Sequence, residues 1–232
     1  MKIFTICLFL ISSIAISQEV KYIETEYLID SYLGKIDDKN CFYLENNLTK
    51  GKNLPLFYKS GTSISKYGDL PLEENTIKVF VFKNHFFTLT REVGSTETTY
   101  KLNSYDSSLQ LTESSILFQT ENSKKANFEI KIDNTLLGII HFTQKEGVVF
   151  MMDLESKKNN TKKFSDEKLN KFSFSDFVFN DRLEANVIFE NMDRKSITNA
   201  PDRSSVVLIS LGKSESAKIQ KIITIYDNKI FP

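Results

Sequence analysis

The sequence has few of the residues that most kinds of functional site require. It contains no Trp, two Cys, two His, four Pro and eight Gly in 232 residues. Phosphate-binding loops and dinucleotide-binding turns depend on clustered glycines, and no such cluster occurs. A G-x-S-x-G elbow, an H-E-x-x-H string and an EF-hand loop are also missing. We therefore expect no catalytic, cofactor-binding or metal-binding residues and no cofactor, and a non-enzymatic role is favoured.

Cysteine is too scarce for a disulfide-stabilised fold. Cys7 lies in the apolar N-terminal segment, and Cys41 is the other cysteine. If the N-terminal segment is removed on export, Cys41 remains alone and no intramolecular disulfide can form. The neighbouring Phe42 and Tyr43 indicate a buried or half-buried strand residue. A catalytic thiolate would need a nearby base.

Charge of one sign is also lacking. Thirty basic residues balance thirty acidic ones. Lys157-Lys158 and Lys162-Lys163 are the nearest approach to a basic patch, but they stand among Asn and Thr beside Asp166-Glu167 and predict a solvated loop. A nucleic-acid partner normally needs a concentrated basic face, so we expect none.

Histidines and paired acids do not form a recognisable site. His85 falls in a predicted turn and His141 inside a predicted strand, so a metal site on either would need carboxylates from other parts of the chain. Adjacent acids on a strand point to opposite faces and cannot act as an acid/base pair. This applies to three acidic pairs: Asp37-Asp38, Glu73-Glu74 and Asp166-Glu167. A pair of acids contributed by separate units stays open.

The N-terminus has the pattern of an export signal. Residues 1–17 carry one Lys, an apolar run and then Ala15 and Ser17 at the small-residue positions that signal peptidase needs. The run from Ile3 to Ile16 is shorter than a membrane-spanning helix requires. We expect cleavage before Gln18, a periplasmic or extracellular location, and no transmembrane segment in the mature chain.

Short β-branched and aromatic runs make up most of the remaining chain and recur with a period. Phe80, Phe128 and Phe174 occupy corresponding places in three successive units, each made of short runs separated by turn residues. The runs are 76–82, 86–91, 100–105 and 109–118, then 128–132, 136–142 and 148–154, then more loosely 172–179, 183–190, 205–211 and 218–226.

This period predicts an all-β fold of antiparallel four-stranded units, each of about 48 residues, in a propeller-like arrangement. Such a unit cannot bury both of its faces alone, so neighbouring units must stack on it. A β-sandwich or a barrel is the alternative, because strands and turns at this spacing also fit those folds.

The predicted division of the chain has three parts. Residues 1–17 are the signal peptide, residues 18–70 an N-terminal segment, and residues 71–232 the β-repeat domain. Gly61 to Asn75, with its Gly, Ser and Pro71, reads as a linker between the last two parts. The N-terminal segment is either a degenerate first blade or a separate piece.

The order of runs and turns at 79–91, 100–111 and 127–132 resembles the blade repeats of secreted bacterial β-propeller-like proteins. In those repeats a strand ends in a Tyr-Asp turn, as at Tyr105-Asp106, and a new strand follows. The resemblance covers about Thr76 to Tyr226 and implies an exported interaction scaffold. Closed propellers have 4 to 8 blades, whereas three units are clear here, and Gly212 replaces the turn Asp in the last unit.

Two functions follow as hypotheses. The first is an exported non-enzymatic binding or interaction scaffold whose partner is a protein or glycan of the cell envelope. The alternative is a β-barrel ligand-binding protein, or an envelope hydrolase with acids from separate repeats, for which a pocket lined by carboxylates or His141 is expected. The long polar loop from Asn191 to Ser204 is a candidate binding loop.

Overall fold

A computed structural model describes residues 31–43, 53–60, 63–122, 126–143, 145–167, 169, 172–191, 205–211 and 218–224. Its strands form four sheets. The first contains β1 (Ser31–Ile36), β2 (Lys39–Tyr43), β3 (Asn53–Ser60) and β4 (Ser63–Pro71). The second contains β5 (Thr76–Phe82), β6 (His85–Val93), β7 (Glu97–Tyr105) and β8 (Leu111–Glu121). The third contains β9 (Asn127–Asp133), β10 (Leu136–Phe142), β11 (Glu146–Asp153) and β12 (Asn159–Ser165). The fourth contains β13 (Ser173–Phe179), β14 (Ala185–Asn191), β15 (Ser205–Leu211) and β16 (Lys218–Thr224).

The strands of each sheet pair with one another in chain order. Every sheet has four strands, and every pairing between neighbours is antiparallel. The predicted all-β fold of antiparallel four-stranded units is thereby confirmed, and its propeller-like character fits the stacked sheets. Successive units begin at Ser31, Thr76, Asn127 and Ser173, close to the predicted period.

The first sheet has the same strand order as the other three. Its strands lie within residues 31–71 and so take up most of the N-terminal segment. The sequence was interpreted there as either a degenerate first blade or a separate piece. The division at residue 70 stays a prediction, since the domain boundaries themselves are not tested. The signal peptide at residues 1–17 and the binding loop at residues 192–204 lie outside the described residues.

The first hairpin in two of the sheets turns through residues with positive φ. Asp37 and Asp38 have φ values of 45° and 63°, and Lys83 and Asn84 have 45° and 59°. Two consecutive residues in the left-handed region form the turn that matches the twist of paired antiparallel strands. These short turns fix the register of β1 with β2 and of β5 with β6.

The third and fourth strands of two sheets are joined by a turn that an Asp organises. The Asp106 carboxylate accepts hydrogen bonds from the backbone N–H groups of Ser108 and Gln110. Asp153 accepts from the N–H groups of Glu155 and Ser156, which lowers the pKa of its carboxyl group. The Tyr-Asp turn expected from the sequence therefore has a physical basis: a short acceptor side chain closes the chain reversal.

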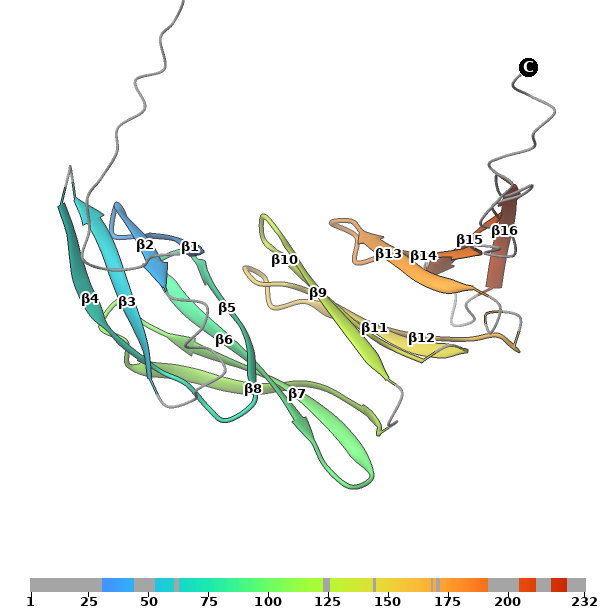
Figure 1. The fold of residues 1–232 in the computed structure, drawn as a ribbon, viewed down its shortest axis with the longest axis horizontal. Coiled ribbons are helices and arrows are strands. Elements are labelled where there is room, and N and C mark those ends of the chain that lie inside the picture. Colours follow the sequence, from blue (N-terminus) through green and yellow to red (C-terminus); the bar gives the residue numbers. More distant parts are fainter. Residues whose placement is uncertain are drawn as a thin grey trace, which may run out of the picture.

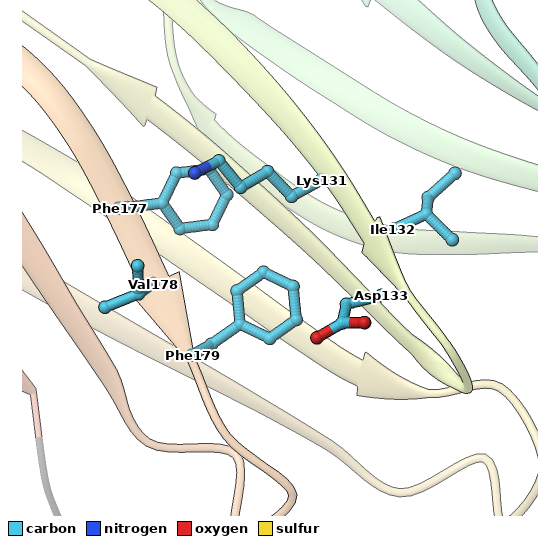
Figure 2. Close-up of a pocket in the computed structure, with 6 residues that line it drawn as sticks. All are labelled: Lys131, Ile132, Asp133, Phe177, Val178 and Phe179. Atoms are coloured by element: carbon cyan, nitrogen blue, oxygen red, sulfur yellow. The ribbon is translucent and has the colours of Figure 1, made fainter. Parts of the chain in front are cut away.

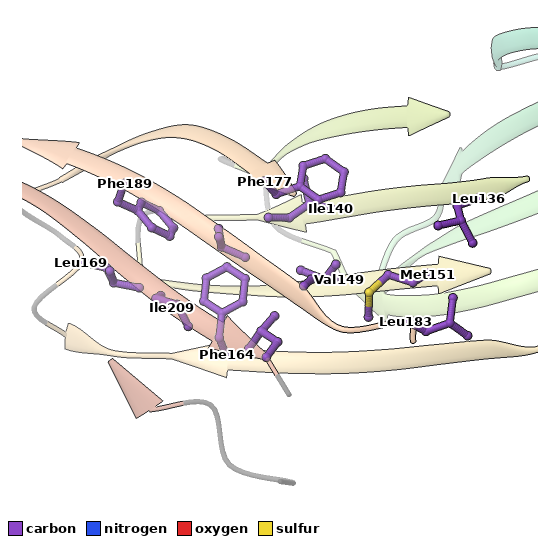
Figure 3. Packing of buried hydrophobic residues seen from close by; sticks show 13 residues of the cluster. Leu136, Ile140, Val149, Met151, Phe164, Leu169, Phe177, Leu183, Phe189 and Ile209 are labelled. Carbon is purple, nitrogen blue, oxygen red and sulfur yellow. The ribbon is translucent and has the colours of Figure 1, made fainter. Parts of the chain in front are cut away.

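Three hydrophobic clusters fill the spaces between successive sheets. One lies between the first and second sheets, one between the second and third, and one between the third and fourth. Figure 3 shows the last of these, where side chains from β10 and β11 meet those from β13, β14 and β15. Its central members are Ile140, Val149, Met151, Phe164, Phe177, Phe189 and Ile209.

The burial pattern of a strand depends on whether its sheet packs against one neighbouring sheet or against two. Leu137 and Ile139 of β10 pack toward the second sheet, while Leu136 and Ile140 pack toward the fourth. A strand covered on both faces reads as a continuous apolar run rather than an alternating one. In β14 the buried positions Ala185, Val187 and Phe189 instead alternate with half-buried ones.

Two strands were predicted wrongly. The sequence indicated a linker from Gly61 to Asn75, but Ser63–Pro71 forms β4, an edge strand of the first sheet. The sequence indicated a solvated loop around Lys162-Lys163, but these residues belong to β12. The reason is the position of β12 at the edge of its sheet, where only Phe164 is buried and the rest of the strand is polar. An edge strand in contact with water on most sides has no apolar alternation for a sequence to reveal.

The four sheets follow one another around an open arc. Figure 1 shows the first strand of each sheet, β1, β5, β9 and β13, on the inner side of the arc and the last strand on the outer side. The first and fourth sheets stand at opposite ends, and no hydrophobic cluster of the described residues joins them. The inner strands therefore border a concave side of the molecule.

Candidate binding groove between β9 and β13

Two inner strands lie at the free edges of neighbouring sheets. β9 is the edge strand of the third sheet and β13 the edge strand of the fourth. Each pairs with one neighbour only, so the backbone N–H and C=O groups on its other side are not used by its own sheet. The unpaired edges of β9 and β13, on the concave side, are therefore the first components of a candidate binding site.

A groove of about 370 Å³ lies between these edges. This volume is at the lower end of the range of about 300–1,000 Å³ that is usual for small-ligand pockets. Figure 2 shows its lining, in which Lys131 and Asp133 of β9 lie toward Phe177 and Phe179 of β13, while Ile132 points to the other face of β9. The lining residues are Lys131, Ile132, Asp133, Phe177, Val178 and Phe179.

Aromatic rings form the wall on the β13 side. Phe177 is fully buried and Phe179 half-buried, and their rings stack with centroids 5.6 Å apart. Between them Val178 points to the other face of β13 and is 45% exposed. A Cβ on Gly138 of β10 would lie 2.3 Å from the Phe179 ring. The glycine thus lets the ring settle against the third sheet.

Lys131 joins the two strands across one part of the groove. Its ammonium group forms an ion pair with Asp176 of β13 and lies 3.9 Å from a carboxylate oxygen of Glu129. The same ammonium is 5.3 Å from the centre of the Phe177 ring. Asp176 also accepts the Phe177 backbone N–H at 2.8 Å. These contacts fix β9 and β13 relative to each other.

Two carboxylates from separate units come near each other here. Burial raises the pKa of Glu129, Lys131 lowers it, and the Asp176 charge raises it again. The sequence left open a pair of acids from separate repeats, and Glu129 of β9 with Asp176 of β13 is such a pair. The lysine between them binds Asp176 directly, so Asp176 is engaged in an ion pair.

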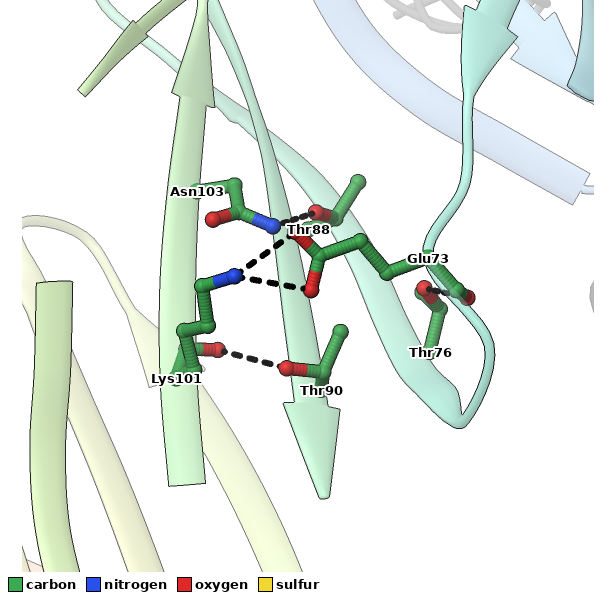
Figure 4. A network of polar contacts seen from close by, with 6 residues as sticks. All are labelled: Glu73, Thr76, Thr88, Thr90, Lys101 and Asn103. Atoms are coloured by element: carbon green, nitrogen blue, oxygen red, sulfur yellow. Dashed lines mark hydrogen bonds and ion pairs between the residues drawn. The ribbon is translucent and has the colours of Figure 1, made fainter. Parts of the chain in front are cut away.

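A second polar cluster lies on the face of the second sheet turned toward the first. Figure 4 shows Glu73 receiving two hydrogen bonds from the Lys101 ammonium, at 2.7 and 3.0 Å. Asn103 donates to the Thr88 hydroxyl at 3.4 Å, and Thr90 donates to the Lys101 carbonyl at 3.5 Å. Most of these groups bond to one another, which makes the cluster a connection between strands and the β4–β5 link.

The two histidines have different surroundings. His141 is 3% exposed, and its Nδ1 lies 3.0 Å from the Tyr100 hydroxyl. Burial, and to a lesser extent the Arg91 charge, lowers the His141 pKa to about 4. His85 is exposed at the start of β6, with Nδ1 3.0 Å from the Lys83 carbonyl. Neither lines the groove.

The other residues that the sequence singled out lie apart from the groove. Cys41 is fully buried in β2, as predicted, and burial raises its pKa to about 11. Asp37-Asp38 form a hairpin turn, Glu73 pairs with Lys101, and Glu167 pairs with Lys145. Within the described ranges no group of three or more His, Cys, Asp or Glu is placed to hold a metal ion.

The groove residues were missed at the sequence level. Phe177-Val178-Phe179 was recognised as part of a strand, but not as the border of a site. The feature of the sequence that could have indicated the groove was this uninterrupted apolar run on the first strand of a unit. Such a run also fits a strand buried in the core.

No helix in the described part of the chain is long and apolar enough to cross a membrane.

Comparisons with known proteins give distant structural similarity only, without a match in sequence. No protein-family model matches the sequence, and no curated protein matches it. A solved structure with a related arrangement is the Nup133 β-propeller domain of Vanderwaltozyma polyspora, with 13% sequence identity and a TM-score of 0.38. The match covers 84% of this chain and 57% of that domain, so the chain spans little more than half of its length.

Proposed function

We propose that the protein is an exported, non-enzymatic interaction scaffold that binds an extended polypeptide segment of a cell-envelope protein between β9 and β13. The observation that carries the proposal is the groove between two strand edges. An extended peptide adds to an exposed sheet edge through main-chain hydrogen bonds, and flanking pockets select its alternate side chains.

The lining of the groove suits such a segment. Phe179 and the alkyl part of Lys131 offer apolar contact to side chains on one face of the peptide. Asp133 is exposed at the side and carries a negative charge that favours a basic residue in the ligand. The preferred ligand therefore alternates apolar and basic residues.

A polypeptide is a better fit than a glycan, the other partner class expected from the sequence. Sugar rings stack on exposed aromatic faces and bond to several polar side chains. Here Phe177 is buried and Phe179 packs against Gly138, so neither ring is presented as a flat platform. Free main-chain groups of two strands are the more abundant binding feature.

Export is supported by the pattern of residues 1–17 alone: one Lys, an apolar run and small residues before Gln18. Secretion of the full chain fused to a reporter, with and without these residues, tests this part. Retention of the full-length fusion in the cytoplasm would contradict it.

The binding proposal is tested with short capped peptides of alternating Val and Lys, measured by fluorescence anisotropy on residues 18–232. We expect saturable binding that is lost when alternate peptide nitrogens are methylated, because methylation removes the main-chain donors. Asp133→Lys weakens binding by charge repulsion, whereas Glu92→Lys, an equal charge change at another exposed position, leaves it unchanged. Binding of chitin oligosaccharides but not of peptides would contradict the choice of a polypeptide.

A hydrolase is the second candidate, favoured by one observation. Burial raises the pKa of Glu129, a change typical of a general acid, and Asp176 from another unit lies near it. Chromogenic glycoside and ester substrates test this function in the wild type and in Glu129→Gln. Turnover that Glu129→Gln abolishes would establish the hydrolase, while turnover unaffected by Glu129→Gln would eliminate this acid from any role.

A further inference from the structure

A different place in the molecule holds several buried polar atoms that lack a hydrogen-bond partner. They include Arg91 Nε, Thr98 Oγ1 and His141 Nε2. Arg91 of β6 stands directly opposite Tyr100 of β7, Thr98 precedes Tyr100 by two residues on the same strand, and the Tyr100 hydroxyl contacts His141 of β10. All three unpartnered atoms therefore belong to one cluster between the second and third sheets.

The direction of the hydrogen bonds in this cluster can be assigned. Burial raises the pKa of the Tyr100 hydroxyl, and the Arg91 guanidinium group, which can only donate and stands opposite Tyr100, lowers it by less. The Tyr100 O–H is then free to donate to His141 Nδ1, 3.0 Å away. A neutral imidazole that accepts at Nδ1 carries its proton at Nε2. His141 Nε2–H is thus a donor, like Arg91 Nε–H, and both lack an acceptor.

The charge of Arg91 is also uncompensated. No carboxylate of the described residues lies within ion-pair distance of its guanidinium group. The ring of Phe128 lies over it, with its centre 4.8 Å from the guanidinium carbon, and Tyr100 stands opposite Arg91 on β7. A half-buried cation surrounded by aromatic rings is costly to leave without a counter-charge.

We propose that this cluster, formed by Arg91, Thr98, Tyr100 and His141, binds a single carboxylate group. A carboxylate supplies two acceptor oxygens for the Arg91 and His141 donors and one negative charge for the guanidinium group. The Thr98 hydroxyl can donate to the same group. A phosphate, with more charge and more oxygens, would call for further cations. The inference is independent of the groove between β9 and β13.

A ligand would reach the site past the side chain of Phe128. This side chain is 36% exposed, whereas Thr98, Tyr100 and His141 are almost fully buried. Its ring lies over Arg91 and meets the Tyr100 ring edge-on at 6.4 Å between centroids. Movement of this side chain would open the cluster to solvent. The ligand would enter at the rim where the β6–β7 and β10–β11 hairpins lie.

The test is a titration of residues 18–232 with sodium acetate at pH 7, with sodium chloride at equal ionic strength as reference. Nitrogen and proton NMR signals of the Arg91 Nε–H and His141 Nε2–H groups are followed. We expect saturable shifts of both signals with acetate only. A parallel titration with acetyl-Gly-Gly distinguishes two sources of the carboxylate, a free small acid and a peptide C-terminus. If access to the cluster is narrow, acetate binds and acetyl-Gly-Gly does not.

Variants make the assignment specific. Arg91→Lys removes the Nε donor and should weaken acetate binding about tenfold, because a lysine cannot present two parallel donors to a carboxylate. Arg182→Lys, the same change at an exposed turn, should have no effect. Thr98→Val keeps a β-branched strand residue and serves as a second variant if Arg91→Lys does not fold.

Three results would overturn the proposal. Shifts that chloride reproduces would show general ionic effects, and an acetate affinity that is unchanged in both Arg91→Lys and Thr98→Val would place the anion elsewhere. Unchanged Arg91 and His141 signals up to high acetate concentration would mean that the unpartnered atoms bond to water only.

Discussion

At the scale of single residues, two buried positions on β10 make specific contacts with different neighbouring sheets. His141 bonds to Tyr100 between the second and third sheets. Gly138, three residues earlier on the same strand, faces the other way and makes room for Phe179 of the fourth sheet. β10 thus contacts both neighbouring sheets, and a change at either position acts on a different interface.

His141 should make stability depend on pH in acid. Its pKa falls from 6.5 to about 4 in the folded protein, chiefly through burial. The unfolded chain therefore binds one more proton than the folded chain between these values, and stability is lost as pH falls from about 6.5 to about 4. One proton corresponds to a slope of about 1.4 kcal/mol per pH unit.

We expect His141→Phe to remove this contribution, as measured by urea denaturation at a series of pH values. His85→Phe, at the exposed histidine, is the matched control and should keep the wild-type slope. An unchanged slope in His141→Phe would mean that other groups cause the acid sensitivity.

Gly138→Ala should destabilise the interface between the third and fourth sheets. The new Cβ would lie 2.3 Å from Cε1 of the Phe179 ring, so the ring must move. Such overpacking costs about 1–3 kcal/mol. Combining the change with Phe179→Leu tests the cause, since a smaller side chain should recover part of the loss. A purely additive double variant would contradict the contact.

At the scale of elements, the hairpin turns explain why the strands were recognised from the sequence. Turn residues such as Lys83-Asn84 and the Asp of the Tyr-Asp turn act locally, through φ values and hydrogen bonds a few residues away. The edge strand β12 was missed because its polar side chains leave no periodic pattern. Local chemistry is visible in a sequence, whereas exposure at a sheet edge depends on its neighbours.

The turn between β5 and β6 should discriminate between side chains at Lys83. Its φ of 45° is costly for a β-branched residue and free for glycine. We expect Lys83→Val to be less stable than Lys83→Gly by about 1–2 kcal/mol in urea denaturation. Both variants lose the ion pair with Glu155, so this contact cancels. Equal stabilities would show that the turn relaxes to another conformation.

At the scale of the whole molecule, the period in the sequence was sufficient to predict stacked four-stranded units. It reflects a physical need, since each sheet must bury a face against the next. The groove was beyond prediction because it depends on where β9 and β13 stand relative to each other. Lys131 and Asp176 are 45 residues apart in sequence, and nothing in either segment indicates that they meet.

The central claim is that the free edges of β9 and β13 receive an extended peptide. Residue-resolved amide hydrogen exchange, with and without a saturating Val-Lys peptide, tests it most directly. We predict slower exchange at alternate amides within Lys131–Asp133 or Phe177–Phe179, as new main-chain hydrogen bonds form. Unchanged exchange in both segments, with protection elsewhere in the chain, would contradict the account.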